Sequence, residues 1–585
     1  MKKPLTITIY ACLIALCFVN KAMAQDVSNK SYPYDPASKT KTDMAKGEVL
    51  KFEYNNSKIY PGTSRSYWVY IPAAYKPGTP ACLFVCLDGV LFNAPDVFDN
   101  LISTGEMPVT IGVFISSGTL MKPDNTVLRY NRTNEFDNLN NRFSRFIMEE
   151  ILPDVEKKKA SDGRAINISP NGNDHAIAGA SSGAICAFTA AWQRPDFFSR
   201  VFSCIGTYVG MRGGDQYPVL VRKTEPKPLR VYLQDNNNDT WNPLFGNWFK
   251  ANIDMEAALN FAGYEVTNMW MEGGHEGKQA TAIFPDAMRW LWKGWPQPVK
   301  AGWSANDMLK NILVEGNTWQ PVKTAFDVEG GIVTMVNGDV AVSDTTGNIY
   351  KIDSTSNTSL LKKQEAHTGF ITVDTSGNIY TLDRLSRKIY AGNNKDKKAV
   401  QGDDVLVMPN GDKYITKPAK SDGEEGSITL QKVDGSTQVV DEDKYIGYAM
   451  AVSPDKGQLI VSKKNSHWLY SYAINPDGTL ADKQTVYWLH NLSNEETEDI
   501  ISMAFDDHGN LYVATKAGVQ VCDQNGRVRA ILDLPAGAVT SVCFGGENFD
   551  TLYVVCNGKL YKRKLKVHGQ PSWRQAMKPV DQGAG

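Results

Sequence analysis

The sequence lacks three features: a long hydrophobic run after its first 24 residues, a zinc-type spacing of cysteine and histidine, and any marked net charge. A membrane-spanning helix needs about 20 consecutive apolar residues, so no insertion into a membrane is expected for residues 25–585. The 62 basic and 64 acidic residues leave a formal charge of −2. This balance argues against nucleic acid or an anionic membrane surface as the partner.

Cysteine is also scarce for a chain of this length, with nine in 585 residues. Cys12 and Cys17 lie in the N-terminal apolar stretch, and the remaining seven are an odd number that cannot all pair within one chain. Cys82 and Cys86 fall on one expected strand, where they are too far apart to bridge. Buried free thiols are therefore expected.

The N-terminus has the pattern of a secretory signal peptide. Lys2 and Lys3 precede an apolar run over residues 7–19, and Ala22-Met23-Ala24 supplies small residues at a cleavage site. We expect residues 1–24 to be removed near Ala24 and the mature protein to be secreted or periplasmic.

The length exceeds what one hydrophobic core supports, so at least two domains are expected. Apolar runs and helical spacings alternate before the boundary marked by Pro296, Pro298 and Gly302, and short alternating strands with Gly, Asn and Asp turns follow it. The predicted parts are a first domain over 30–297, a linker over 298–304, an all-β domain over 305–572 and a flexible tail over 573–585.

In the first domain, continuous apolar runs predict strands that are buried on both faces of a mostly parallel sheet, with helices on both sides. These runs are residues 83–87, 109–115, 201–205, 229–233 and 265–271. Helical spacing covers residues 140–155 and 284–292, and an alternating pattern over 62–72 predicts one further strand.

A short apolar run, 175–178, leads into Gly179-Ala180-Ser181-Ser182-Gly183, and a helical stretch follows. A strand, a Gly-x-Ser-x-Gly turn and a helix form the nucleophile elbow of α/β-hydrolases. Small residues two positions either side of the serine are needed because the turn is tight. Ser181 is therefore the predicted nucleophile, and the Ser182 amide at the helix start is a predicted oxyanion donor.

A serine nucleophile needs a base within hydrogen-bond reach. The first domain contains only His175 and His275. His175 precedes Ser181 on the same strand and should lie at the strand's other end, whereas His275 sits in a Gly-rich loop after the 265–271 strand. His275 is therefore the predicted base.

The base needs an acid to fix its tautomer, and Asp235 and Asp239 in the loop after the 229–233 strand compete for that role. Asp239 is favoured because the loop must turn before a carboxylate can reach the histidine. The second oxyanion donor is expected in the turn after residues 83–87, where the Gly89 or the Val90 amide can serve; we select Gly89.

Several stretches together resemble the esterase-D and enterochelin-esterase-like branch of the α/β-hydrolases, which includes feruloyl and acetyl-xylan esterases. They are Pro61 to Arg65, Leu87-Asp88-Gly89, Gly179 to Gly183, Gly246-Asn247-Trp248, Gly273-Gly274-His275 and Arg289 to Trp292. The resemblance covers residues 45–295 and implies that the second aspartate of the acid loop, Asp239, is the catalytic acid. Asn236 stands where the family usually has glycine.

The second domain repeats a polar turn followed by a short strand rich in Tyr or Val. The pattern recurs at Gly338, Gly377, Gly411, Gly457 and Gly509 and, in degenerate form, at Asp550. Six units of this size predict a six-bladed β-propeller.

This half resembles the gluconolactonase and senescence-marker-protein propellers through Glu329-Gly330, 405–415, 451–455, 509–515 and 552–554. The resemblance implies a metal held by a glutamate, an asparagine and an aspartate. Glu329 matches the glutamate, but Tyr448 and Ile501 occupy the other two positions. Hard cations need oxygen ligands, so we expect no metal and no lactonase activity, unless Asp403 or Asp404 rebuilds a site.

The sequence thus predicts a secreted serine esterase that needs no cofactor and carries an accessory propeller. The resemblance implies a plant polysaccharide or oligosaccharide ester as substrate, with feruloyl or acetyl groups on xylan. A siderophore or another small ester is the alternative substrate. A glycan-binding protein with an inactive hydrolase scaffold is the alternative of another class.

Overall fold

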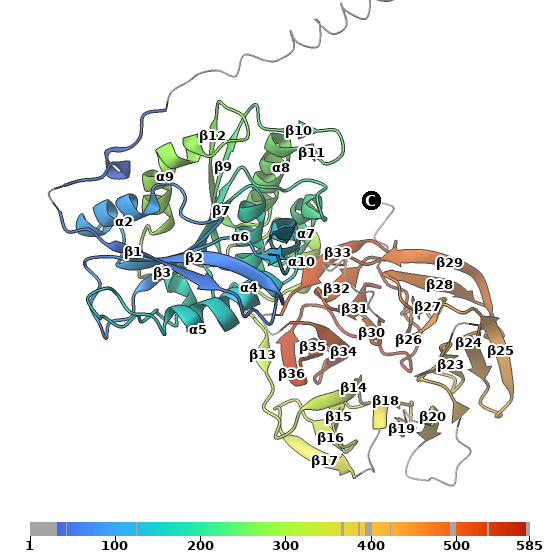
Figure 1. The fold of residues 1–585 in the computed structure, drawn as a ribbon. Helices are drawn as coiled ribbons and strands as arrows, with labels where there is room; N and C mark the ends of the chain where they lie inside the picture. The colour runs from blue at the N-terminus through green and yellow to red at the C-terminus, as the bar shows by residue number, and fades with distance from the viewer. Residues whose placement is uncertain are drawn as a thin grey trace, which may run out of the picture. The chain divides into compact units, whose positions relative to one another are not determined.

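The computed structural model describes residues 32–580 except 43, 125, 364–367, 384–385, 392–399, 422, 492–498 and 535–536. The predicted signal peptide, residues 1–24, lies outside the described residues. The chain forms two compact units (Figure 1). The first runs to Asp215 and adds Leu229–Ala257 and Glu265–Val299; the second comprises Gln216–Pro228, Ala258–Tyr264 and Lys300–Gly585. Within the described residues, no helix has both the length and the apolar character that a membrane crossing requires.

The first unit is built on a ten-stranded sheet in the order β12-β9-β8-β7-β3-β4-β2-β5-β6, with β1 paired to β2. The strands from β4 to β12 along this order are parallel, and β1, β2, β5 and β6 pair antiparallel. Their bounds are β1 Glu48–Tyr54, β2 Thr63–Ile71, β3 Cys82–Leu87, β4 Thr110–Ile115, β5 Thr119–Met121, β6 Val127–Tyr130, β7 His175–Ala180, β8 Arg200–Cys204, β9 Arg230–Asn236 and β12 Glu265–Met271.

Helices lie on both sides of this sheet (Figure 1). Their bounds are α2 Ala94–Ser103, α3 Arg132–Phe136, α4 Arg142–Phe146, α5 Leu152–Val155, α6 Ser182–Gln193, α8 Trp248–Phe261 and α9 Lys278–Leu291. A π-helical turn, Ile147–Ile151, joins α4 to α5. The arrangement fits the α/β-hydrolase class.

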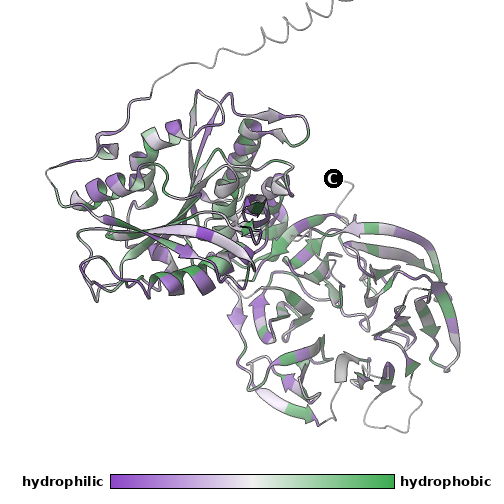
Figure 2. Ribbon diagram, viewed as in Figure 1, coloured by the Kyte–Doolittle hydropathy of each residue, from purple (hydrophilic) through white to green (hydrophobic). Residues whose placement is uncertain are grey.

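The core explains why the central strands are continuous apolar runs. Every residue of β3 and β4 is buried, because helices cover both faces. On one face Phe84 of β3 packs edge-on against Phe98 of α2, with ring centroids 4.9 Å apart, and against Phe284 of α9 at 5.8 Å. Hydrophobic residues, green in Figure 2, follow these strands and helices. The seven cysteines among the described residues are free and buried, as predicted.

The second unit contains six four-stranded antiparallel sheets, which confirms the predicted six-bladed propeller. Five blades use consecutive strands, and the sixth joins β13 (Gln320–Pro321) to β36, β35 and β34. The other bounds are β14 Val328–Thr334, β15 Val340–Asp344, β16 Ile349–Ile352, β17 Thr358–Lys362, β18 Thr368–Val373, β19 Ile379–Asp383, β20 Lys388–Ala391, β21 Val400–Gln401, β22 Asp404–Val407, β23 Lys413–Lys417, β24 Ser427–Gln431, β25 Thr437–Glu442, β26 Ile446–Val452, β27 Gln458–Lys463, β28 Trp468–Ile474, β29 Leu480–Trp488, β30 Met503–Phe505, β31 Leu511–Thr515, β32 Gly518–Cys522, β33 Val528–Leu532, β34 Val539–Gly545, β35 Thr551–Cys556 and β36 Lys559–Lys564.

The repeated glycine pattern marks one position in the fold. Each of the five glycines, and Asp550 in the sixth unit, lies between the first and second strands of its blade. In two blades this turn begins with an aspartate, Asp374 or Asp506, that accepts hydrogen bonds from backbone amides two and four residues later and from an asparagine side chain. Asp344 makes the same bonds in the turn between the second and third strands of the first blade.

The C-terminal segment differs from the flexible tail expected for residues 573–585. Trp573 is buried and packs with Phe549, and the Arg574 guanidinium lies 4.4 Å from the Phe549 ring centroid. The Met577 amide donates to the Pro454 carbonyl at 3.0 Å. Within the described part of the tail, up to residue 580, the chain is thus attached to the propeller. An aromatic side chain in a polar stretch gives too weak a sequence signal to predict this.

Candidate active site

Ser181 occupies a strained turn between β7 and α6, with φ 59° and ψ −121°. The turn can form because the residues two positions before and after the serine, Gly179 and Gly183, carry no side chain. A Cβ on Gly179 would lie 2.3 Å from the Gly183 carbonyl carbon, and one on Gly183 would lie 2.9 Å from Asp88 Oδ2. Real Cβ atoms do not approach this closely, so the elbow needs both glycines.

The structure brings Ser181, His275 and Asp239 together in one line of hydrogen bonds. His275 Nε2 lies 2.9 Å from Ser181 Oγ, and His275 Nδ1 lies 2.6 Å from Asp239 Oδ1. With a neutral imidazole, the serine hydroxyl donates to Nε2 and the Nδ1–H donates to the carboxylate. The Asp239 side chain is fully buried, whereas 31% of the His275 side chain is exposed.

Two loops hold the histidine against the aspartate. The Asn237 and Asn238 amides donate to the carbonyls of Met271 and Gly273 at 2.8 and 3.0 Å. The Asn236 side chain donates to the Gly274 carbonyl at 2.8 Å. Asn236, which departs from the family's glycine, therefore supports the histidine loop.

Asp235, the competing acid, does not contact His275 in the structure. It is fully buried near the end of β9 and accepts hydrogen bonds from the Asn236 amide at 2.6 Å and from Asn252 Nδ2 at 2.8 Å. Burial and the neighbouring Asp239 carboxyl raise the pKa of Asp235. The position next to histidine belongs to Asp239.

The oxyanion donors remain predictions, and the geometry ranks them. Ser182 opens α6, so its amide lies in the first turn, where helix amides have no acceptor within the helix. The Gly89 amide already donates to the Ile115 carbonyl at 3.3 Å. This bond favours the Val90 amide over Gly89 as the second donor.

His175 lies at the N-terminal start of β7, at the other end of the strand from Ser181. Its ring nitrogens are 2.9 Å from the Phe197 carbonyl and 2.7 Å from the Ser169 carbonyl, and the side chain is fully buried. Burial lowers the pKa of His175. This geometry is that of a structural histidine.

Sequence reasoning missed Thr207, a polar residue that contacts the nucleophile. Thr207 Oγ1 lies 3.3 Å from Ser181 Oγ and accepts a hydrogen bond from Trp248 Nε1 at 3.2 Å. The Trp248 ring meets the His275 ring edge-on, with centroids 6.0 Å apart. The Gly246-Asn247-Trp248 stretch carried a family signal for Trp248, but nothing near Thr207 marked it.

A charged group lies behind the elbow and was also missed. Arg132 donates two hydrogen bonds to Asp88, at 2.8 and 2.6 Å, and contacts the Ala180 carbonyl at 3.3 Å. Asp137 is fully buried beside Ser182, and burial raises the pKa of Asp137 to about 6. The Arg132 guanidinium is thus the partner of Asp88 and fixes the turn leading to Gly89.

In the propeller, the three positions at which the family resemblance implies metal ligands hold Glu329, Tyr448 and Ile501. Asp403, a residue proposed to rebuild a site, pairs with Arg387, and the fully enclosed Asp404 accepts hydrogen bonds from the Val405 and Met450 amides. Within the described ranges, no group of three or more His, Cys, Asp or Glu side chains is placed to hold a metal ion.

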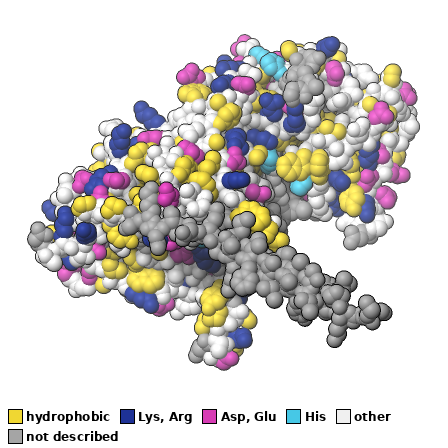
Figure 3. Space-filling view, turned by 90° about the horizontal axis from the view of Figure 1, so that it is seen from above, with side chains coloured by type: hydrophobic (Ala, Val, Ile, Leu, Met, Phe, Trp, Pro, Cys, Tyr) yellow, Lys and Arg dark blue, Asp and Glu magenta, His cyan; other side chains and the backbone are white. Residues whose placement is uncertain are grey.

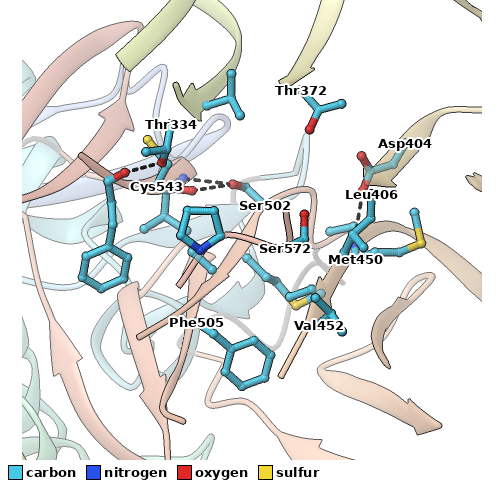
Figure 4. A pocket seen from close by; sticks show the side chains of 18 of the residues that line it. Thr334, Thr372, Asp404, Leu406, Met450, Val452, Ser502, Phe505, Cys543 and Ser572 are labelled. Atoms are coloured by element: carbon cyan, nitrogen blue, oxygen red, sulfur yellow. Dashed lines mark hydrogen bonds between the residues drawn. The ribbon is translucent and has the colours of Figure 1, made fainter. Parts of the chain in front are cut away.

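The centre of the propeller is a channel lined by the first strands of the blades and by residues 570–573 (Figure 4). Most of its polar side chains are already bonded to backbone. Thr334 donates to the Phe544 carbonyl, and Ser502 Oγ accepts from the Val542 amide at 3.0 Å. Asp404 lies beside Met450 on one wall of the channel and accepts a hydrogen bond from its amide at 3.0 Å (Figure 4). The wall is otherwise mainly apolar.

On the face drawn in Figure 3, Lys and Arg side chains are interspersed with Asp and Glu side chains. No broad area of one sign stands out among the described residues on that face.

Comparisons with known proteins match two successive regions of the chain. Residues 59–312 match the family model described as "Putative esterase", and residues 314–557 match the model of the SMP-30/Gluconolactonase/LRE-like region. A 6-deoxy-6-sulfogluconolactonase of Pseudomonas putida is 28% identical over 131 residues, which are 22% of this chain and 44% of that protein. The chain spans about half the length of the curated relatives it matches.

Two solved structures each resemble one part. A gluconolactonase of Xanthomonas campestris has 18% identity and a TM-score of 0.38, covering 44% of this chain and 93% of that one. A ferulic acid esterase has 16% identity and a TM-score of 0.34, covering 42% of this chain and 98% of that one. The chain therefore joins an N-terminal region that matches an esterase family to a C-terminal region that matches a gluconolactonase-like family.

Proposed function

We propose that the protein is a serine carboxylic-ester hydrolase. The observation that carries the proposal is the hydrogen-bonded line from Ser181 through His275 to the buried Asp239, with the serine on a strained elbow. The match of residues 59–312 to an esterase family supports it. This arrangement provides a nucleophile, a base and an acid that fixes the base's tautomer.

The proposed reaction is a two-step acyl transfer. Ser181 Oγ attacks the ester carbonyl carbon while His275 Nε2 takes the serine proton, and the Ser182 amide stabilises the oxyanion. The C–O bond to the alcohol then breaks, and the imidazolium returns the proton to that alcohol. Water, activated by the same nitrogen, attacks the acyl-serine and releases the acid. Asp239 stays ionised and stabilises the imidazolium in both steps.

For the substrate we propose an ester on a plant polysaccharide or oligosaccharide, with an aromatic acyl group such as feruloyl favoured over acetyl. The support is a hairpin, β10 (Trp241–Asn242) and β11 (Gly246–Asn247), that starts two residues after Asp239 and ends beside Trp248. Its Trp241 and Leu244 side chains are among the most exposed large apolar groups of the described chain. Apolar surface next to a triad suits an apolar acyl group.

The test compares feruloylated and acetylated xylo-oligosaccharides, a catecholate siderophore ester and a p-nitrophenyl acyl ester on the same preparation. Labelling of Ser181 by an organophosphate, read by peptide mass spectrometry, identifies the nucleophile independently of the substrate. Faster turnover of the feruloylated substrate is expected. Labelling at another residue, or no hydrolysis of any ester, would overturn the proposal.

The C-terminal region matches a family with lactonase relatives, so a second activity must be considered. We propose that the propeller is an accessory domain without metal-dependent lactonase activity. An isoleucine at position 501 offers no oxygen ligand, and a neutral phenol at Tyr448 is a poor ligand for calcium or magnesium. We propose, as well, that the mature protein acts outside the cytoplasm after removal of residues 1–24.

A further inference from the structure

Two buried carboxyl groups lie together at the end of β9, and the proposed mechanism uses only one of them. Asp239 Oδ1 binds His275. Asp239 Oδ2 is buried, and among the described residues it has no hydrogen-bond partner. The Asp235 carboxyl lies within hydrogen-bonding reach of the Asp239 carboxyl. A second acidic group thus lies close to the triad acid, which has one oxygen without a donor.

Two carboxylates cannot hydrogen-bond to each other, because an ionised carboxylate only accepts. Two buried like charges in contact also repel strongly, so one of the pair must keep a proton. The question is which carboxyl keeps it.

The surroundings decide between them. Asp239 Oδ1 lies 2.6 Å from His275 Nδ1 and accepts from the Thr240 amide, so this oxygen serves as an acceptor for two N–H groups. Asp235 accepts hydrogen bonds from two neutral groups, the Asn236 amide and the Asn252 side chain from α8. The main influences on the pKa of Asp235 are burial, Asp239, the Asn236 amide and the Asn252 side chain, and none of them is a cation.

We infer that Asp235 carries the shared proton and donates it to Asp239 Oδ2, which makes Asp235 a positioning residue for the triad acid. The inference rests on the proposed function. The donated bond fixes the plane of the Asp239 carboxylate, so that Oδ1 points at His275 Nδ1.

The direct test is infrared spectroscopy of the whole protein at pH 7. The difference spectrum between the wild type and Asp235→Asn should show the C=O stretch of a protonated carboxylic acid, present only in the wild type. The matched control is Asp162→Asn, because Asp162 is an exposed aspartate and should change no such band. Absence of the acid band in the wild type, or its persistence in Asp235→Asn, would overturn the inference. This readout does not depend on ester turnover.

The second test uses the pH dependence of hydrolysis. When Asp235 ionises at alkaline pH, two adjacent charges should distort the triad, so wild-type kcat should fall there. Asp235→Asn keeps an N–H donor and cannot ionise, so kcat should stay within about threefold of the wild type near pH 7 and lose the alkaline decline. Asp235→Ala removes the donor and should lower kcat about 10- to 100-fold with little change in KM.

Equal kcat for the alanine and asparagine variants, or an unchanged alkaline decline in Asp235→Asn, would overturn the inference. If no ester is hydrolysed but the acid band is lost in Asp235→Asn, the esterase proposal fails while the shared proton stands. If esters are hydrolysed but no acid band is found, only the assignment to Asp235 fails.

Discussion

At the scale of single residues, the hydroxyl of Ser181 is the atom on which turnover depends. Ser181→Ala should lower kcat by roughly 10³- to 10⁶-fold, because the nucleophile is lost while the rest of the site remains. Ser64→Ala, which removes a surface hydroxyl, should leave kcat unchanged. Both variants should keep the wild-type circular dichroism spectrum. If Ser181→Ala retains more than about a tenth of wild-type turnover, another residue is the nucleophile.

Asp137 provides a prediction about pH and stability. Its folded pKa of about 6 lies above the ordinary value of 3.8, so the folded state holds the proton more tightly than the unfolded chain. This stabilisation is complete below the ordinary pKa and is lost as the pH rises through 6. Asp137→Asn should therefore raise the thermal unfolding midpoint at pH 8 and have less effect at pH 4.

The difference of about two pKa units between the unfolded and folded states corresponds to a loss of about 3 kcal/mol in the free energy of unfolding of the wild type between pH 4 and pH 8. Thermal scans of both proteins at pH 4, 6 and 8 measure it. A midpoint gain that is equal at all three values, or larger at pH 4, would show that Asp137 ionises normally.

Most of the candidate triad could be predicted from the sequence, because each member follows a recognisable strand. His275 was found by elimination between two histidines. The oxyanion donor could not be chosen, because the choice depends on which backbone amide is already bonded, here Gly89 to Ile115. Thr207 and Asp137 carry no motif, and only their positions in space mark them.

At the scale of elements, the elbow depends on the close approach of β7 and α6. Gly179→Ala should prevent normal packing of the elbow, since the added Cβ meets backbone at Gly183. We expect loss of soluble protein or a thermal midpoint lowered by several degrees, with turnover lost. The control is Gly277→Ala, whose Cβ would meet nothing within 4 Å. Equal stability and turnover of the two variants would contradict the prediction.

The same scale shows why the blades were predictable and the tail was not. A blade turn repeats its glycine and its polar residues because every blade needs the same reversal between its first two strands. Six repeats reinforce one another as a signal. The segment around Trp573 occurs once, and its attachment to Phe549 depends on the Trp573 ring and the Arg574 guanidinium, which no repeat marks.

At the scale of the whole molecule, the two family matches raise the question of whether one chain carries two activities. We predict that the full-length protein does not hydrolyse gluconolactone above the spontaneous rate, with or without added calcium, magnesium, manganese or zinc. Ser181→Ala is tested in parallel, so that any lactone opened by the esterase site is recognised. Titration by calorimetry measures metal binding directly.

The matched variant for this prediction is the double substitution Tyr448→Asn and Ile501→Asp, which supplies oxygen ligands at the two inherited positions. It should bind a divalent cation more tightly than the wild type, because Glu329 then has two partners. Chelator-sensitive lactonase activity in the wild type itself would contradict the prediction.

The sixth blade takes β13 from one end of the propeller and β36 from the other, with Gln320 opposite Lys562 and Pro321 opposite Tyr561. The beginning and the end of this domain are therefore neighbours in one sheet. A short linker between them would allow new chain ends to be opened between any two other blades, which makes the domain a natural subject for circular permutation. It also means that the domain can be carried as an insert within another protein's loop without either host end being forced apart.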